Sequence, residues 1–181
     1  MKASDVAKFF VDIFNKEQIY QITNLKLNKI LFYAQGWFLN KYNKPLFNDQ
    51  IEAWDLGPVV SDVYQMYKSF GKNHISLKDN EDDFKEDSIS TEELELLIDV
   101  YNEYSKYSAS ELIDMTHEKN TPWDQVYEKK KNKVIPLELI KKYFASLDKI
   151  PSISDVDFSK LEPIGHIDTD GHLILPASER N

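Results

Sequence analysis

The chain has 181 residues, and at about 150 residues per domain this length accommodates one well-formed domain with a sizeable core. Hydrophobic residues make up 41% of it, with 10 Phe, 10 Tyr and 3 Trp, a composition that excludes disorder for most of the chain. The formal net charge is −9, and the only arginine is Arg180. Because phosphates and base edges are read largely by guanidinium groups, we expect no nucleic acid and no anionic membrane as partner. A basic protein partner is favoured.

The absence of cysteine and the sequence of the first residues both favour the cytoplasm. Cysteine is absent, which removes disulfides, thiolate catalysis and cysteine-type zinc sites and fits a reducing compartment. The stretch Met1–Asp5 reaches charged residues without an apolar segment, and no long apolar run follows. We therefore expect a cytoplasmic protein.

Helices are predicted to dominate the fold. The chain has 5 Gly, which are too few for the frequent turns of an all-β fold. Apolar residues at helical spacing predict a first helix capped by Ser4 and a second from about Leu25 to Tyr42. The second is apolar on most sides and should form the buried centre. A further helix spans Val63–Phe70 and ends at Gly71.

Capping signals predict three more helices, and apolar residues after Pro136 predict a fourth. Ser90 with Glu93 and Ser108 with Glu111 match the capping box, and Thr121 precedes a proline at the first helical position. A last helix follows Pro136, with its buried side predicted to consist of Leu137, Ile140, Phe144 and Leu147.

Short extended segments complete the predicted fold. Residues 50–60 alternate in polarity up to a turn at Gly57-Pro58, and residues 74–77 are predicted to lie beside them as a strand. Near the C-terminus, residues 164–167 and 173–175 flank an Asp-Gly turn. The predicted class is mainly α: a compact multi-helix domain over residues 1–148 with a small β element around 50–77, and a C-terminal extension, 149–181, with a β-hairpin.

Catalytic templates do not match, so we expect no enzyme, no cofactor and no metal. His117-Glu118 begins like a zinc-protease helix, but the second histidine is replaced by Thr121. The cluster from His166 to His172 contains Asp-x-Asp-Gly as in a calcium loop, but Ala177 stands where the closing glutamate belongs. A metal-dependent or hydrolytic enzyme using His117 or the His166–His172 cluster remains the alternative.

Acidic and aromatic residues are the candidate contact groups. Residues 61–100 contain 11 acidic and 4 basic residues, including the run Glu81–Asp83, which is either a solvated loop or a patch that steers a basic partner. Trp54 stands just before Gly57-Pro58, and His117 lies near Trp123. These tryptophans either close the core or line a partner groove.

Four segments together resemble the Panacea domain of SocA-like antitoxins. They are residues 23–37, 44–47, 51–64 and 116–123, and the resemblance extends over roughly residues 5–147. It implies a mainly helical domain with a small β element. It also implies the antitoxin of a type II toxin–antitoxin system, which neutralises a toxin encoded by an adjacent gene through direct protein contact.

The resemblance leaves two other roles open. One is a proteolytic adaptor that delivers a client to a ClpXP-type protease, and the other is an accessory protein of a phage or genomic island. Residues 149–181 match nothing in the shared domain, and an exposed hairpin edge there would suit pairing with a partner strand. The residues predicted to bind the partner are Trp54, Gly57, Pro58, Tyr64, His117, Pro122 and Trp123.

Overall fold

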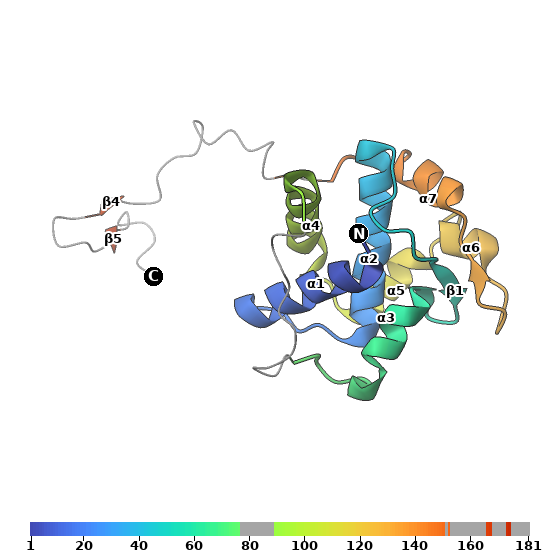
Figure 1. Ribbon diagram of the computed structural model, residues 1–181, viewed down its shortest axis with the longest axis horizontal. Helices are drawn as coiled ribbons and strands as arrows, with labels where there is room; N and C mark the ends of the chain where they lie inside the picture. Colours follow the sequence, from blue (N-terminus) through green and yellow to red (C-terminus); the bar gives the residue numbers. More distant parts are fainter. Residues whose placement is uncertain (77–88, 151, 153–165, 168–172, 175–181) are drawn as a thin grey trace. The chain divides into compact units, whose positions relative to one another are not determined.

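The computed structural model describes residues 1–76, 89–150, 152, 166–167 and 173–174. The chain divides into two compact units, Met1–Pro151 and Ser152–Asn181. The described part of the first unit contains seven α-helices, which confirms the predicted mainly α class (Figure 1). They are α1 (Ala3–Glu17), α2 (Asn24–Tyr42), α3 (Ser61–Met66), α4 (Thr91–Tyr104), α5 (Ala109–Thr116), α6 (Pro122–Val126) and α7 (Leu137–Phe144).

Helix α2 is the centre of this unit, as its apolar sequence predicted. Helices α1, α3, α4, α5 and α7 all contact it, and its side chains are buried from Leu27 to Leu39. Gly36 lets α7 approach closely, since a Cβ atom at this position would lie 2.1 Å from the ring of Phe144. The buried Gln35 amide donates to the carbonyl of Phe47 and accepts from the N–H groups of Leu46 and Phe47, so this polar group is satisfied within the core.

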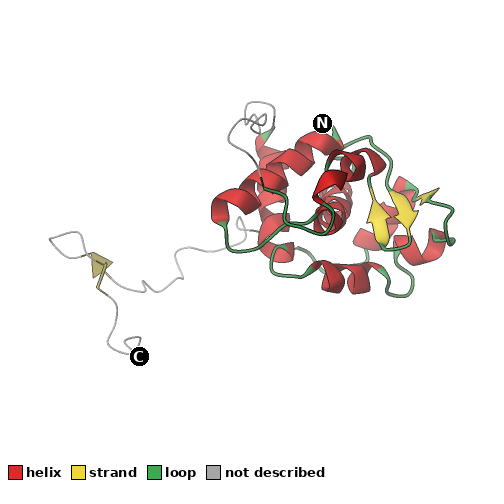
Figure 2. Ribbon diagram, turned by 90° about the horizontal axis from the view of Figure 1, so that it is seen from below, coloured by secondary structure: helices red, strands yellow, loops and turns green. Residues whose placement is uncertain are grey.

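A three-stranded antiparallel sheet lies at one side of the helices (Figure 2). Its order is β2 (Gly57–Val59), β1 (Glu52–Trp54) and β3 (Lys133–Val134). The predicted extended segment is therefore a hairpin, but the predicted turn at Gly57-Pro58 is wrong. The turn consists of residues 55–56, and Pro58 lies in strand β2 with its carbonyl facing a helix, an edge position that does not need an N–H group.

The predicted strand at residues 74–77 is also wrong. His74 forms an isolated bridge with Thr23, and Ile75 donates its backbone N–H to the carbonyl of Ile22. The strand beside β1 is β3, in which Lys133 pairs with Ala53. This pairing joins segments about 80 residues apart in the chain, a distance at which hydrophobic spacing carries no information.

Helix starts follow their local signals closely. The capping boxes of Ser90 and Ser108 and the cap of Thr121 are all formed. The predicted cap at Ser4 is wrong. Helix α1 begins at Ala3, and Lys2 holds the cap position, with its N–H donating to the Asp5 carboxylate.

Two helices are shorter than their apolar patterns predicted. Helix α3 ends at Met66, and the 3-10 helix η1 (Lys68–Phe70) continues to Gly71. In α7, Ile140 and Phe144 are buried as predicted. Leu137 and Leu147, which were also predicted to be buried, are 39% and 36% exposed because they stand at the first residue of the helix and beyond its end.

The second unit contains the predicted hairpin strands, β4 (His166–Ile167) and β5 (Leu173–Ile174), paired antiparallel. The turn between them, with most of the His166–His172 cluster, lies outside the described residues, as does the acidic run Glu81–Asp83. Among the described helices, none is long and apolar enough to cross a membrane.

Candidate functional site

A hollow of about 370 Å³ opens on the surface where the β1–β2 hairpin meets α2 and α3. The size is that of a site for a small ligand or for one or two side chains. Trp54 and Tyr64 stand with their ring centres 4.9 Å apart. The hollow is lined by Leu25, Asn28, Trp54, Asp55, Leu56, Val59, Tyr64, Lys130 and Asn132.

Two polar side chains of α2 support the hairpin from beneath. Asn28 accepts a hydrogen bond of 2.9 Å from the backbone N–H of Val60, and the Lys29 Nζ donates one of 3.0 Å to the carbonyl of Pro58. Both side chains are buried, so these bonds replace water at the outer edge of strand β2.

Gly57 makes room for the lysine. Its φ angle is +102°, and a Cβ atom there would lie 2.5 Å from Lys29 Cε and 2.9 Å from Thr116 Oγ1. An L side chain rarely adopts this backbone conformation. Position 57 is therefore restricted to glycine by both its backbone angle and the close approach of Lys29.

A stack of three rings supports the hairpin from the side of α5 and α6. The rings of His117 and Trp123 are parallel with centres 3.7 Å apart, and Tyr127 stacks on the other side of Trp123 at 4.3 Å. The Trp123 indole N–H donates to the carbonyl of Trp54 at 2.8 Å, and the Tyr127 hydroxyl donates to Asp55 at 3.0 Å. The stack thus binds the β1 end of the turn that carries Leu56, through Trp54 and Asp55.

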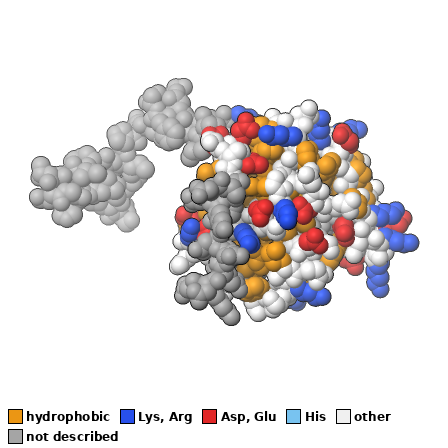
Figure 3. Space-filling model, viewed as in Figure 1, with side chains coloured by type: hydrophobic (Ala, Val, Ile, Leu, Met, Phe, Trp, Pro, Cys, Tyr) orange, Lys and Arg blue, Asp and Glu red, His pale blue; other side chains and the backbone are white. Residues whose placement is uncertain are grey.

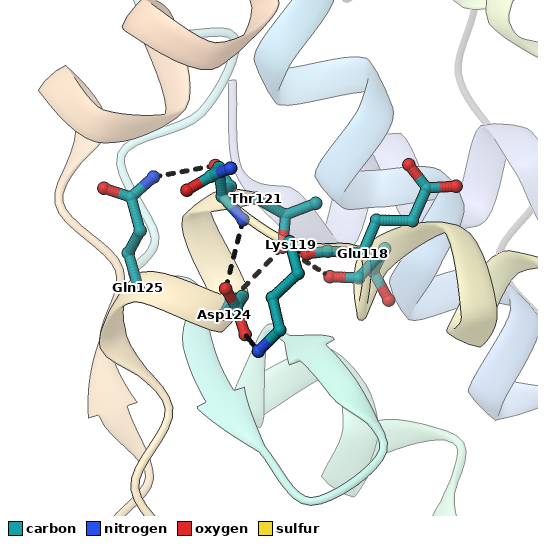
Figure 4. A network of polar contacts seen from close by, with 7 residues as sticks. Glu118, Lys119, Thr121, Asp124 and Gln125 are labelled. Atoms are coloured by element: carbon teal, nitrogen blue, oxygen red, sulfur yellow. Dashed lines mark hydrogen bonds and ion pairs between the residues drawn. The ribbon is translucent and has the colours of Figure 1, made fainter.

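The corner between α5 and α6 holds this stack in place (Figure 4). Thr121 donates its hydroxyl to the carbonyls of Thr116 and Glu118 and accepts from the N–H of Asp124. The Asp124 carboxylate accepts from the N–H of Asn120 and pairs with Lys119. The backbone bond from Asn120, followed by Lys119, lowers the pKa of Asp124. Because His117 and Trp123 flank this corner, its bonds set the separation of their rings.

Burial shapes the charge beneath the hairpin. It lowers the pKa of Lys29 from its ordinary value of 10.5 to about 7. Burial also lowers the pKa of His117, and the positive charge of Lys29 lowers it further, while Asp114 opposes the shift. Nε2 of His117 is buried and has no hydrogen-bond partner within the described part of the chain. Burial therefore disfavours the charged form of both bases, and Lys29 adds to this effect at His117.

The structure brings the seven predicted residues to one corner but at different depths. Trp54 and Tyr64 line the hollow and are half-buried, as is His117. Gly57 and Pro58 are buried in the hairpin, and Pro122 and Trp123 are buried behind it.

Sequence reasoning missed most of the hollow's lining and the lysine beneath it. Leu25, Leu56 and Lys130 come from three separate segments, and no local pattern joins them. For Asn28 and Lys29 a signal existed, since both are polar residues within a helix that is otherwise apolar on most sides. As for metals, no group of three or more acidic or histidine side chains among the described residues is placed to hold an ion.

Comparison with known proteins places the seven predicted residues within a family match, whereas Leu25, Tyr127 and Lys130 of this corner lie outside it. Residues 27–124 match the family described as "Antitoxin SocA-like, Panacea domain". Antitoxin SocA of Caulobacter vibrioides (strain NA1000 / CB15N) is 30% identical over 118 residues, which cover 58% of this chain and 60% of the relative. The match thus spans about three fifths of the relative's length. No solved structure matches the chain.

Proposed function

The chain belongs to the family of SocA-like antitoxins with a Panacea domain, and on that premise we propose that it neutralises one toxin protein by binding it directly. The family supports an antitoxin role. The toxin would be the product of an adjacent gene, and the pair would form a type II toxin–antitoxin system. The hollow beside the β1–β2 hairpin would be the contact surface.

The observation that carries this proposal is a partly exposed aromatic pair on a rigid support. Trp54 and Tyr64 are half-buried beside Leu56, which is 54% exposed. The hairpin that presents Trp54 and Leu56 is bonded to Lys29 and Trp123. Partly exposed Trp and Tyr on a preorganised surface are typical of interaction hot spots, because little conformational entropy is lost when they bind.

Co-expression with the product of the neighbouring gene tests the proposal. We expect that product to arrest growth alone, and the chain to restore growth and to co-purify with it. Tyr64→Ala should weaken both effects, whereas Tyr20→Ala, which removes a tyrosine that is 39% exposed on the loop between α1 and α2, should leave them unchanged. Absence of both rescue and co-purification would overturn the proposal.

The half-life of the toxin in the same co-expressing cells distinguishes neutralisation by binding from delivery to a protease. If the chain acts by binding alone, the half-life of the toxin is unchanged or longer when the chain is present. A half-life that falls, and recovers when the protease gene is deleted, would identify the adaptor role instead.

A further inference from the structure

We propose that the hollow receives a toxin segment in which an aromatic or large aliphatic side chain stands next to lysines or arginines. This inference rests on the proposed function and adds the chemistry of the segment that is bound. It follows from three features of the surface around the hollow: its apolar lining, an acidic depression beside it, and a lysine at its opposite end.

The apolar part of the lining fits the anchor side chain. Leu25, Val59, and the rings of Trp54 and Tyr64 contribute to the walls, and Leu56 is more than half exposed at the tip of the hairpin. Removing large apolar side chains from water lowers the free energy of a complex in proportion to the area that is buried. A single bulky side chain of the partner would cover this group.

An acidic depression adjoins the hollow at the start of strand β1. It has a volume of about 190 Å³ and is lined by Asp49, Glu52 and Asp62, with Gln50, Val60 and Ser61 between them. Glu52 joins the two hollows, because its carboxylate accepts a 2.7 Å hydrogen bond from the Trp54 indole. Within the described residues, no lysine or arginine lies within ion-pair distance of these three carboxylates.

The opposite end of the hollow has a positive balance of charge, because the lysines at 129–131 outnumber the Asp55 carboxylate that lines the hollow with Lys130. Lys133 of β3 pairs with Ala53 of β1, so Lys130, which precedes it, lies toward the hairpin turn, and the N–H of Lys130 donates to Asp55. Figure 3 shows basic side chains gathered at the edge where Figure 1 places the loop between α6 and β3. Residues 129–131 of this loop are all lysine, and no carboxylate among the described residues pairs with them.

The order of these features along β1 selects the partner's chemistry. Carboxylates alone lie at the strand's start, the aromatic pair follows, and at the turn the lysines around Lys130 outnumber the Asp55 carboxylate. A basic side chain next to the anchor therefore finds complementary charge on one side of the hollow and repulsion on the other, which fixes the direction in which the segment lies. The carboxylates at the start of β1 would repel a partner segment that placed acidic residues there.

Peptides test this chemistry without knowledge of the toxin. The probe is acetyl-Gly-Lys-Lys-Trp-Ser-Gly-amide, titrated into the full-length ¹⁵N-labelled chain at low salt. We expect shifts of the Trp54 indole signal and of backbone amides 52–60. Replacing both lysines of the peptide by glutamate should weaken binding about fivefold, an effect that shrinks in high salt, and replacing its tryptophan by alanine should weaken binding about tenfold.

Charge variants of the chain assign the effect to the acidic depression. Asp62→Lys should remove or reverse the preference for the lysine peptide. Asp62→Asn should reduce the preference without placing a cation in the first turn of α3. The matched control is Glu138→Lys, an equal charge change at an exposed position of α7, which should leave the preference unchanged.

The outcomes distinguish this inference from the proposed function. Equal affinities for the three peptides, shifts confined to other regions, or no binding at millimolar concentration would overturn the inference, even if co-expression rescues growth. Binding with the expected order, combined with no rescue by the chain, would leave the chemistry of the hollow in place and overturn the antitoxin role.

Discussion

Trp54 and Trp123 lie at the same corner of the molecule, joined by one hydrogen bond, but their surroundings differ. Trp123 is 7% exposed, lies between two stacked rings and donates to the backbone of Trp54. Trp54 is half-buried, contacts Tyr64 and donates to the side chain of Glu52. The corner therefore has a buried supporting side and a more exposed side, and the exposed side is the contact side in the proposal above. We expect changes on the supporting side to lower the stability of the fold, and changes on the contact side to lower binding alone.

The largest loss of stability is expected from Gly57→Ala. The added Cβ atom would meet Lys29 and Thr116 at a backbone angle unfavourable to alanine, so the free energy of unfolding should fall by about 2–4 kcal/mol. Urea denaturation followed by circular dichroism measures this change.

The control is Gly71→Ala, where φ is +57° but no atom lies within 4 Å of the added Cβ. This variant should lose only the cost of a positive-φ backbone outside the left-handed helical region (ψ is −118°), on the order of 1–3 kcal/mol. Gly57→Ala should lose more, because close contacts add to a similar backbone cost. An equal loss at both positions would show that the lysine beneath the hairpin does not restrict residue 57.

The next effect is a rise in stability with pH. Unfolded lysine keeps its proton to about pH 10, whereas the lowered pKa of Lys29, about 7, lets the folded chain release its proton earlier. Between these values the unfolded state binds more protons, so stability should increase by about 1 kcal/mol per pH unit from pH 7.5 to 9.5. Lys26, whose pKa burial lowers to about 8, adds to the same slope.

Lys29→Met should remove about half of this slope or more, as measured by urea denaturation at each pH. Lys129→Met, at an exposed position, serves as the control and should leave the slope intact. A slope that is the same in the Lys29→Met protein and in the wild type would mean that Lys29 keeps an ordinary pKa.

A smaller effect is expected when the same substitution is made at each tryptophan. Trp123→Phe keeps an aromatic ring but removes the N–H that bonds the Trp54 carbonyl, and should cost about 1–2 kcal/mol of stability. Trp54→Phe removes a bond to a half-buried carboxylate, and should cost less than about 0.5 kcal/mol. If the two losses were equal, the division into supporting and contact sides would be wrong.

The smallest change in stability is expected from Leu56→Ser. This side chain is 54% exposed, so the free energy of unfolding should change by less than about 0.5 kcal/mol. Co-purification of the toxin should nevertheless decrease. Ile19→Ser, at a position that is 68% exposed in another loop, should change neither quantity. Loss of toxin binding in both variants would indicate a general effect of surface hydrophobicity.

Local signals account for the parts of the fold that the sequence predicted well. Ser90, Ser108 and Thr121 were identified as helix caps because a cap depends on residues three positions away. Strand β3 has two residues, too few to show alternation, and its pairing with β1 depends on the folded path of the chain.

The candidate site was predicted only in part, because local signals identify residues near turns but do not show how the fold arranges them. Trp54 and Trp123 were found as aromatic residues near turns, but their different depths depend on α2 and the ring stack. Asn28 and Lys29 were assigned to an apolar helix, and only the fold shows that they face the hairpin. The domain boundary near residue 148 remains a prediction.

The two hydrogen bonds from Asn28 and Lys29 also protect the sheet from self-association. An additional strand beside β2 would need the Val60 N–H and the Pro58 carbonyl, and both already bond to side chains of α2. Unpaired strand edges are a common route to aggregation, and here helical side chains close one of the two. By its order β2-β1-β3, the other edge of this sheet, within the described residues, is β3.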